Sequence, residues 1–248
     1  PAAPVKASPD SGLVGRWHFD EGIGSTATDS SGYGNHGTLS GGKFGNALWF
    51  NGASDYVEVP DSASLDITGD ITLEAWIYRT KSNAFQGIVA KYSGDISQRS
   101  YMLYVSNLNM LRLIVSVNGL QQGASYAWVE STVTLPLNSW VHVAGTYDGD
   151  ANLKLYINGA DRTGTVTGTI SSIFSGSAPV LIGDFTQEGP THYYFGGLID
   201  EVRISKIVRT SFDLSTAPTA DASTVGLWHF DESVGLKGLR QFTCCSSQ

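Results

Sequence analysis

The chain has 248 residues, of which 41% are hydrophobic and 15% are charged, and it contains 29 glycines and 8 prolines. This composition indicates a folded body with many tight turns. A formal net charge of -8, without clusters of lysine and arginine, excludes nucleic acid as a partner, because nothing would displace the counterions of the phosphate backbone. The sequence has no apolar run of about 18 residues, so we expect no membrane-spanning segment.

The first elements are a linker, a strand and a long loop. Residues 1–11 are rich in proline, alanine and serine and are predicted to be an N-terminal linker. Strand-like alternation begins at Leu13 and predicts that Trp17 and Phe19 point inward. The polar stretch that follows, up to Gly42, is long for a loop, and we expect something to hold it in place.

Short apolar runs then follow at roughly ten-residue spacing, separated by Gly, Asn or Asp. They are "ALWFNGASDYVEVP", "ITLEAWIYR", "QGIVAKY", "SYMLYVS", "MLRLIVSVNG", "WVHVAGTYDG", "NLKLYING", "APVLIGD" and "GGLIDEVRIS". This pattern predicts an all-β fold, a two-sheet antiparallel β-sandwich or a barrel, formed by residues 12–208 as one domain. No segment predicts an amphipathic helix of three turns, and "TSFDLSTAP" could hold only a short helical turn.

One phrase occurs twice: "VGRWHFDEG" at residues 14–22 returns as "VGLWHFDES" at residues 225–233. We interpret residues 209–222 as a linker and residues 223–248 as the first strand of a truncated second repeat with an atypical tail. The tail carries both cysteines, Cys244 and Cys245, so no disulfide framework is predicted for the domain. Alternatively, residues 225–230 are the closing strand of the single domain. We expect the phrase to be disordered, or paired with a neighbouring molecule or a free sheet edge, and deletion after Pro218 to leave the fold stable.

Several phrases in order resemble the laminin-G-like jelly-roll domain of the concanavalin A-like lectin and glucanase superfamily. They include "ATDSSGYGNHGTL", "FGNALWFNGASDYVEVPDSASLD", "WVHVAGTYDG" and "FGGLIDEVRIS". The resemblance implies a concanavalin A-like jelly roll with one concave sheet, variable rim loops and, in many members, a calcium ion. It also implies an extracellular or cell-surface module, often in tandem and often beside carbohydrate-active catalytic domains.

Catalysis is not expected. Glucanases of this superfamily carry a strand with Glu-x-Asp-x-x-Glu, whose two glutamates are nucleophile and acid, and the chain has no such motif. Strand alternation places Asp200 and Glu201 on opposite faces, which would keep them from acting as a pair. The histidines have no metal-ligand spacing, and His142 in its strand is predicted to be structural.

Calcium is the expected cofactor, because loops rich in Asp, Asn and Gly offer the oxygen ligands that this ion prefers. The predicted ligands are Asp20, Asp29, Asn51, Gly52 and Asp200, with Asn35 and Asp55 in the same loops. The resemblance implies that the "FDG" and "IDEVRI" phrases lie nearest the ion, although Asn51 stands where many members have Asp. Alternatively, residues such as Asp29 and Asn35 cap turns through their side chains.

The expected ligand is a polysaccharide or other glycan, which needs exposed aromatic faces and planar hydrogen-bonding side chains. Trp17, Trp49, Trp76 and Trp140 lie in apolar strand patterns and are predicted to be core. Tyr126 and Trp128, in a stretch that we place between strands, share a face by their spacing, and aromatic side chains also follow a Gly-Pro pair. The predicted ligand-binding residues are Tyr126, Trp128, His192, Tyr193 and Arg99; each could instead be an ordinary rim side chain.

These observations predict a non-catalytic, lectin-like carbohydrate-binding module of a larger secreted or cell-surface protein. The alternative, from a different class, is a structural or adhesion module that binds surface proteins and no sugar. The two differ in whether any glycan binds.

Overall fold

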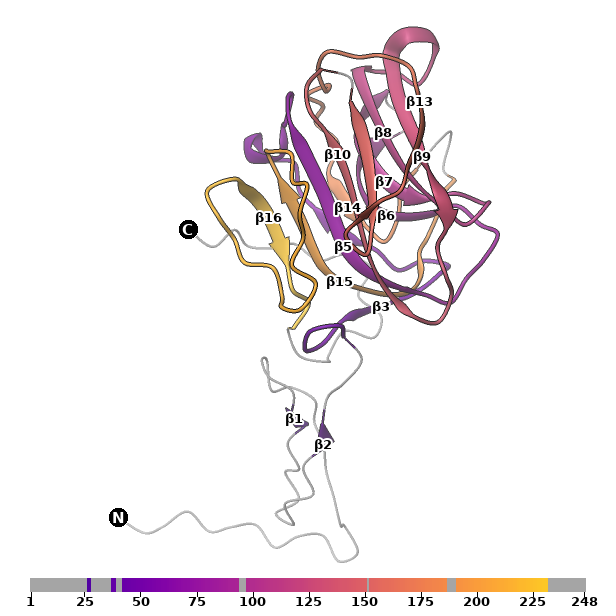
Figure 1. Ribbon diagram of the computed structural model, residues 1–248, viewed down its shortest axis with the longest axis vertical. Helices are drawn as coiled ribbons and strands as arrows, with labels where there is room; N and C mark the ends of the chain where they lie inside the picture. Colours follow the sequence, from indigo (N-terminus) through magenta and orange to yellow (C-terminus); the bar gives the residue numbers. More distant parts are fainter. Residues whose placement is uncertain are drawn as a thin grey trace, which may run out of the picture.

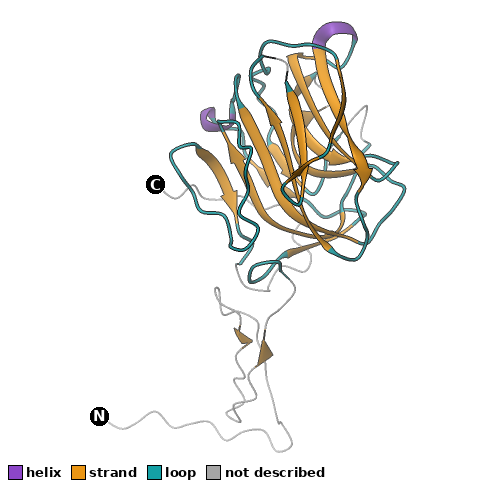
Figure 2. Cartoon of the chain, in the orientation of Figure 1, coloured by secondary structure: helices purple, strands orange, loops and turns teal. Residues whose placement is uncertain are grey.

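The computed structural model describes residues 26–27, 37–38, 42–93, 97–150, 152–186 and 191–231. These residues form two antiparallel seven-stranded sheets packed as a sandwich, which confirms the predicted all-β architecture. Helix within the described ranges is confined to two short 3-10 turns, η1 (Ala63–Leu65) and η2 (Gly123–Ser125) (Figure 2). A separate two-residue ladder joins β1 (Thr26–Ala27) to β2 (Gly37–Thr38).

The two sheets are named here after their central strands, and both are visible in Figure 1. The β5 sheet has the order β12 (Ala160–Asp161), β11 (Leu153–Ile157), β10 (Trp140–Tyr147), β5 (Ile71–Arg79), β15 (Gly196–Ser205) and β16 (Thr224–Trp228), with β3 (Leu48–Asn51) also beside β15. The β7 sheet has the order β13 (Thr163–Thr167), β9 (Tyr126–Thr134), β8 (Met110–Gly119), β7 (Gln98–Val105), β6 (Gln86–Ser93), β14 (Val180–Ile182) and β4 (Val57–Val59).

The core lies between the sheets and follows from the two-residue period of the strands. On β5, Ile71, Leu73, Ala75 and Ile77 are buried in the main apolar cluster, and the residues between them face the other side of the sheet. Leu103 and its neighbours on β7 and β8 close the cluster from the opposite sheet. Each buried side chain of this size contributes roughly 1.5–3 kcal/mol of transfer free energy.

The predicted strands that fall within the described ranges are found. "ITLEAWIYR", "MLRLIVSVNG" and "GGLIDEVRIS" coincide with β5, β8 and β15. The strands on either side of the Asn51–Gly52 turn do not pair with each other, because β3 joins the β5 sheet and β4 joins the β7 sheet. Tyr126 and Trp128 lie within β9, not between strands as the sequence analysis placed them.

The prediction that Trp49 is a core residue is wrong, because 54% of its surface is exposed. It begins a stripe that crosses the outer face of the β5 sheet through the cross-strand partners Leu198, Tyr78 and Trp140. All three partners are half-buried. Trp76 is buried as predicted, but on the outer face of the sheet, where its ring meets the edges of Phe44 and His142.

The repeated phrase near the C-terminus forms β16, which pairs with β15 of its own chain (Figure 1). This position fits a strand that has found a free sheet edge, and it also fits a closing strand of a single domain. The first copy, with Trp17 and Phe19, lies outside the described residues. The predicted boundary between the domain and a second repeat therefore stays a prediction.

A β-bulge in β15 interrupts the strand alternation. The prediction that Asp200 and Glu201 lie on opposite faces depends on that alternation. Asp200 pairs with Trp76 and Arg203 with Glu74, so two residues of β15 face one residue of β5. Glu201 adopts a positive φ of 53° at this bulge. Burial raises the pKa of Asp200 to about 7, and the charge of the nearby Glu201 acts in the same direction. The strict alternation that would place the two carboxyl groups on opposite faces is therefore broken at this point.

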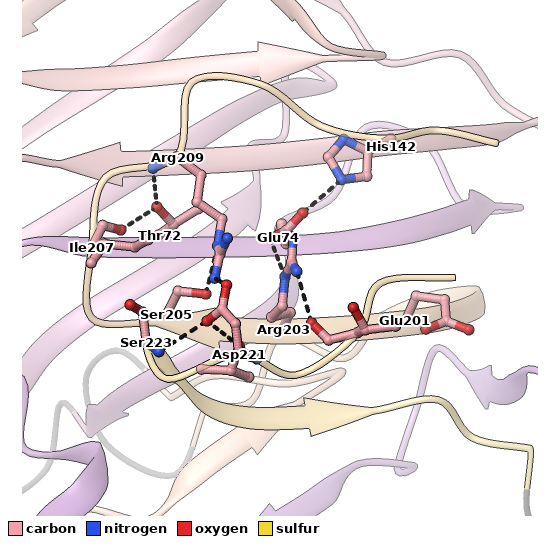
Figure 3. A network of polar contacts seen from close by, with 12 residues as sticks. Thr72, Glu74, His142, Glu201, Arg203, Ser205, Ile207, Arg209, Asp221 and Ser223 are labelled. Atoms are coloured by element: carbon pink, nitrogen blue, oxygen red, sulfur yellow. Dashed lines mark hydrogen bonds and ion pairs between the residues drawn. The ribbon is translucent and has the colours of Figure 1, made fainter. Parts of the chain in front are cut away.

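A buried polar network crosses the outer face of the β5 sheet (Figure 3). Glu74 accepts a hydrogen bond from Arg203 Nε at 2.6 Å and pairs with His142 Nε2 at 3.2 Å. The segment after β15 runs over it and is tied down where Thr72 Oγ1 donates to Ile207 O at 2.6 Å. His142 is thus a structural residue here, in line with the sequence analysis.

This network predicts a pH-dependent contribution of Glu74 to stability. Burial by itself raises the pKa of Glu74, but the hydrogen bonds and charges of His142 and Arg203 outweigh it and lower the pKa. A carboxylate with a lowered pKa stabilises the fold above its unfolded pKa, and the contribution is lost as the pH falls through the folded pKa. We expect Glu74→Gln to lower the free energy of unfolding by about 2 kcal/mol at pH 7 and by less at pH 3, as measured by urea titration.

The control for this test is Asp70→Asn, at an exposed carboxylate, where a change within about 0.5 kcal/mol is expected at both pH values. An equal loss for Glu74→Gln at pH 3 and pH 7 would contradict the role of the ionised carboxylate.

Candidate functional site

Three loops and the segment before β15 meet at one end of the sandwich and line a groove of about 550 Å³, here called the Tyr193 groove. The loops are the β3–β4 turn, the β5–β6 loop and the β7–β8 turn. The lining residues are Gly52, Ala53, Lys81, Asn83, Ala84, Phe85, Asn107, His192, Tyr193 and Tyr194. Its volume lies within the roughly 300–1,000 Å³ typical of small-molecule sites.

One wall of the groove is aromatic and is held by packing. The Tyr193 ring stacks on Phe185 with centroids 4.7 Å apart, and its edge meets Phe85 at 5.5 Å. The Tyr193 carbonyl accepts a hydrogen bond from Gly87 N at 2.9 Å, which ties the segment to β6. This wall is therefore formed before any ligand arrives.

A buried carboxylate fixes the residues beside Tyr193. Asp184 accepts a hydrogen bond from Tyr193 N at 2.9 Å and pairs through its other oxygen with His192 Nδ1. Burial raises the pKa of Asp184, and the hydrogen bond and charge of His192 act against that rise. The exposed His192 ring is held parallel to Tyr194, with centroids 5.1 Å apart.

Polar side chains also line the groove, among them Lys81, Asn83 and Asn107. Asn83 N donates to Asn109 Oδ1 at 3.0 Å, and Asn109 Nδ2 donates back to Asn83 Oδ1 at 2.9 Å. Arg79 Nη2 donates to the same Asn109 oxygen at 2.8 Å, so one buried guanidinium fixes the two loops that carry Asn83 and Asn107. Lys81 Nζ donates to Gly52 O at 3.0 Å and joins the β5–β6 loop to the β3–β4 turn.

Two other hollows in the described part of the chain fit a ligand less well. The one beside Glu74, His142 and Arg203 measures about 180 Å³, below the usual size of a ligand site. The one beside Ile170 and Ser171 measures about 440 Å³ but has no aromatic side chain among its lining residues. The Tyr193 groove combines aromatic faces with amide groups and is the candidate site.

The sequence profile of the concanavalin A-like lectin/glucanases superfamily matches residues 51–215. This chain belongs to that superfamily. The match confirms the resemblance to laminin-G-like jelly rolls, and it covers the strands from β4 to β15 and all the residues that line the groove.

Solved structures of the superfamily fold agree with this assignment. A Bacteroides ovatus ATCC 8483 protein thought to bind carbohydrate superposes with a TM-score of 0.58 and 20% identity, covering 82% of this chain and 58% of its own. A heptameric SAP-like pentraxin from Limulus polyphemus superposes with a TM-score of 0.50 and 16% identity, and the match covers 76% of this chain and 93% of the pentraxin chain. Domains LG4-5 of the mouse laminin alpha1 chain superpose with a TM-score of 0.50 and 13% identity, and the match covers 82% of this chain and 47% of the laminin chain. No curated protein sequence matches the chain significantly.

Four of the five predicted ligand residues fall into two groups on this lectin/glucanase sandwich. His192 and Tyr193 line the groove. Tyr126 and Trp128 lie with Tyr193 around one aromatic cluster on the outer face of the β7 sheet, and Arg112 covers the Trp128 ring at 4.7 Å. Two strands, β7 and β8, lie between β9 and β6 in the sheet. At the usual strand spacing, the distance from β9 to β6 is about 14 Å. Arg99 is buried, 5.5 Å from the Tyr92 ring, and does not line the groove.

Within the described ranges, the predicted calcium ligands do not lie together around one point. Asp20 and Asp29 lie outside these ranges. Asn51 Oδ1 accepts hydrogen bonds from Ala53 N and Ser54 N, both at 2.8 Å, and Gly52 O is taken by Lys81. Asn51 pairs with Gly196, four residues from Asp200 along β15, and no cluster of three acidic, His or Cys side chains is found in the described ranges.

Several groove residues escaped the sequence analysis, among them Lys81, Asn83, Phe85 and Asn107. Asn83 carries one local signal, a positive φ of 53° that asparagine tolerates in turns. The place of the others depends on contacts between loops that are far apart in sequence.

Proposed function

We propose that this chain is a non-catalytic, extracellular carbohydrate-binding module that holds a glycan in the Tyr193 groove. The observation that carries the proposal is that one groove combines an aromatic wall fixed by packing with the side-chain amides of Asn83 and Asn107, the first of which is fixed by hydrogen bonds. A sugar ring presents C–H groups that stack on aromatic faces and hydroxyl groups that bond to amides. The carbohydrate binding suggested for the Bacteroides ovatus relative agrees with this proposal.

The lining of the groove supports a binding role over hydrolysis. Glycosidases use two carboxyl groups on either side of the scissile bond. The described residues that line the groove include no Asp or Glu. Release of reducing sugar from a polysaccharide by the purified chain would overturn this part of the proposal.

We also propose a structural calcium ion near Asp200 and the loop that precedes β3. Asp200 Oδ2 accepts hydrogen bonds from Lys43 N at 2.8 Å and Phe44 N at 3.2 Å, while its buried Oδ1 has no hydrogen-bond partner among the described residues. A buried, unsatisfied carboxylate oxygen is costly unless a cation balances it. Removal of calcium by a chelator should lower the melting temperature, and an unchanged melting temperature would contradict the site.

An adhesion role is favoured by one other observation. The exposed stripe of Trp49 with its half-buried partners on the outer face of the β5 sheet is an apolar surface of the kind that protein partners cover. None of the helices in the described ranges is long and apolar enough to cross a membrane.

The test is affinity electrophoresis in gels that contain plant, algal or host polysaccharides, with millimolar calcium. We expect Tyr193→Ala to abolish retardation. Asn107→Ala, at an exposed residue of the groove, should weaken the affinity about 3- to 10-fold, which corresponds to one hydrogen bond.

The matched control is Trp49→Ala, an exposed aromatic outside the groove, which should bind like the parent. Loss of binding in Trp49→Ala with retention in Tyr193→Ala would move the site to the stripe. The absence of binding to every polysaccharide would favour the adhesion role.

A further inference from the structure

β16 occupies a slot along the open edge of β15. Trp228 lies opposite Val202, and Gly226 lies opposite Ile204. Val225, Trp228 and Phe230 pack against the main core from this position. The slot is bounded at its other end by β3, which covers the first part of the same edge.

At the end of the slot that follows Trp228, polar groups bind the side chains of His229 and Asp231. His229 Nδ1 pairs with Glu201 Oε2, on the residue whose positive φ forms the bulge. Asp231 Oδ1 accepts a hydrogen bond from Asn46 N at 2.8 Å, and the Asp231 carbonyl accepts another from Asn46 Nδ2 at 3.2 Å. A strand that fills this slot therefore needs histidine and aspartate after its tryptophan.

The slot also needs a glycine. A Cβ on Gly226 would lie 2.4 Å from the Cη2 atom of the Trp228 ring, which folds back over it. Any larger residue would displace the indole from the core. The fitted sequence is thus Gly-x-Trp-His-Phe-Asp.

The first copy of the phrase carries each of these residues, as Gly15, Trp17, His18, Phe19 and Asp20. Among residues 225–231 only Leu227 differs from its counterpart, which is Arg16. Leu227 lies opposite Arg203, on the outer face of the sheet, and is not among the residues that pack against the core. Among the described residues, the β16 side chains that pack against the core, Val225, Trp228 and Phe230, are the same in both copies of the phrase.

We propose that the β15 slot accepts either copy of the phrase, so that residues 14–20 of a second copy of this chain can replace β16 and join the two chains by strand exchange. Within one chain the tethered β16 has the advantage of a high effective concentration. Exchange is therefore favoured when β16 leaves the slot or when the protein is concentrated. A reciprocal exchange closes a dimer with twofold symmetry.

The first test is Leu227→Arg in the full chain, which makes the two phrases identical over seven positions. If the slot does not distinguish the copies, the melting temperature should stay within about 2 °C of that of the parent, because the change is on the outer face. A fall of 8 °C or more, about 2 kcal/mol for a domain of this size, would show that arginine opposite Arg203 is rejected and would overturn the proposal.

The second test uses the full chain with Trp228→Ser, Trp17→Ser and both changes, followed by light scattering and urea denaturation. Trp228→Ser should dimerise at high concentration, with a midpoint that rises toward the parent value as the concentration increases, because the first copy fills the slot of the partner. Trp17→Ser should stay monomeric with the parent midpoint. The double variant should be monomeric with a lowered midpoint.

Two outcomes would overturn the proposal. An equal loss of midpoint in Trp228→Ser and in the double variant would mean that the first copy does not enter the slot. A monomeric Trp228→Ser chain with the parent midpoint would mean that the first copy of the same chain fills it, without exchange between chains. If Trp228→Ser does not fold at all, light scattering of the parent chain at high concentration decides: a dimer that Trp17→Ser removes supports the proposal, and a parent chain that stays monomeric overturns it.

Discussion

Replacing Arg79 by methionine is expected to lower the free energy of unfolding by about 4 kcal/mol and to disrupt the Tyr193 groove. Arg79 is 1% exposed, and it donates hydrogen bonds to Leu135 O at 2.9 Å, Lys81 O at 3.0 Å and Asn109 Oδ1 at 2.8 Å. Hydrogen bonds from a charged donor are worth about 1.5–3 kcal/mol each. Asn109 Oδ1 keeps the hydrogen bond from Asn83 N and Lys81 O keeps the one from Gln86 Nε2, so Leu135 O is the acceptor that loses its partner. Burial lowers the pKa of Arg79 to about 10, so the guanidinium is charged at neutral pH and its hydrogen bonds are charge-assisted.

Urea denaturation measures the stability change, and affinity electrophoresis measures the effect on the groove. Arg79→Lys should be intermediate, since an ammonium group cannot reach three separated acceptors with the geometry of a guanidinium. The matched control is Arg162→Met at an exposed arginine, with an expected change within about 0.5 kcal/mol. A loss below about 1 kcal/mol in Arg79→Met would contradict the role assigned to this side chain.

Gly197→Ala is expected to cost more than about 3 kcal/mol, through strain and a direct clash. Gly197 has a φ of 135°, which side chains rarely adopt, and a Cβ there would lie 2.0 Å from the Tyr78 carbonyl oxygen on β5. Because backbone and not a flexible side chain blocks the space, β5 and β15 would have to separate. The effect should appear as a lower urea midpoint.

The control for this substitution is Gly69→Ala. No atom lies within 4 Å of a Cβ built on Gly69, and its φ lies outside the positive region. We expect no loss at Gly69, and a small gain is consistent with the reduced entropy of the unfolded chain. Equal effects of the two substitutions would show that the close approach at Gly197 is not what limits stability.

The sequence predicts the strands well because their apolar alternation is a local property. The main exception is β9, where Tyr126 and Trp128 face outward and the inward residues between them are Ala127 and Val129. Because the outward side chains of β9 are aromatic, the apolar and polar residues do not alternate clearly in its sequence. The prediction for Trp49 is wrong for a different reason: its neighbours in sequence are those of a core residue, but its side chain lies on the surface.

The candidate site is predictable only in part. Tyr193 has a local signal, an aromatic side chain after a Gly-Pro loop, and the structure places it in the groove. Asn83 reaches the groove through its contact with Asn109, 26 residues away, and both depend on Arg79. The bulge at Glu201 likewise has no local signal, since strict alternation was the only available assumption for a strand of ten residues.

The central place of β15 bears on how the chain folds as it is synthesised. β15 pairs with β3 and β16 on one side and with β5 on the other, and β5 lies more than a hundred residues earlier in the sequence. Until β15 leaves the ribosome, one edge of β5 and the apolar faces beside it have no partner. Sandwiches dominated by such distant pairings fold in milliseconds to seconds, and their unpaired edges are prone to aggregation meanwhile. Nascent chains arrested before residue 196 should therefore depend on chaperones, while those arrested after β15 has emerged should resist proteolysis.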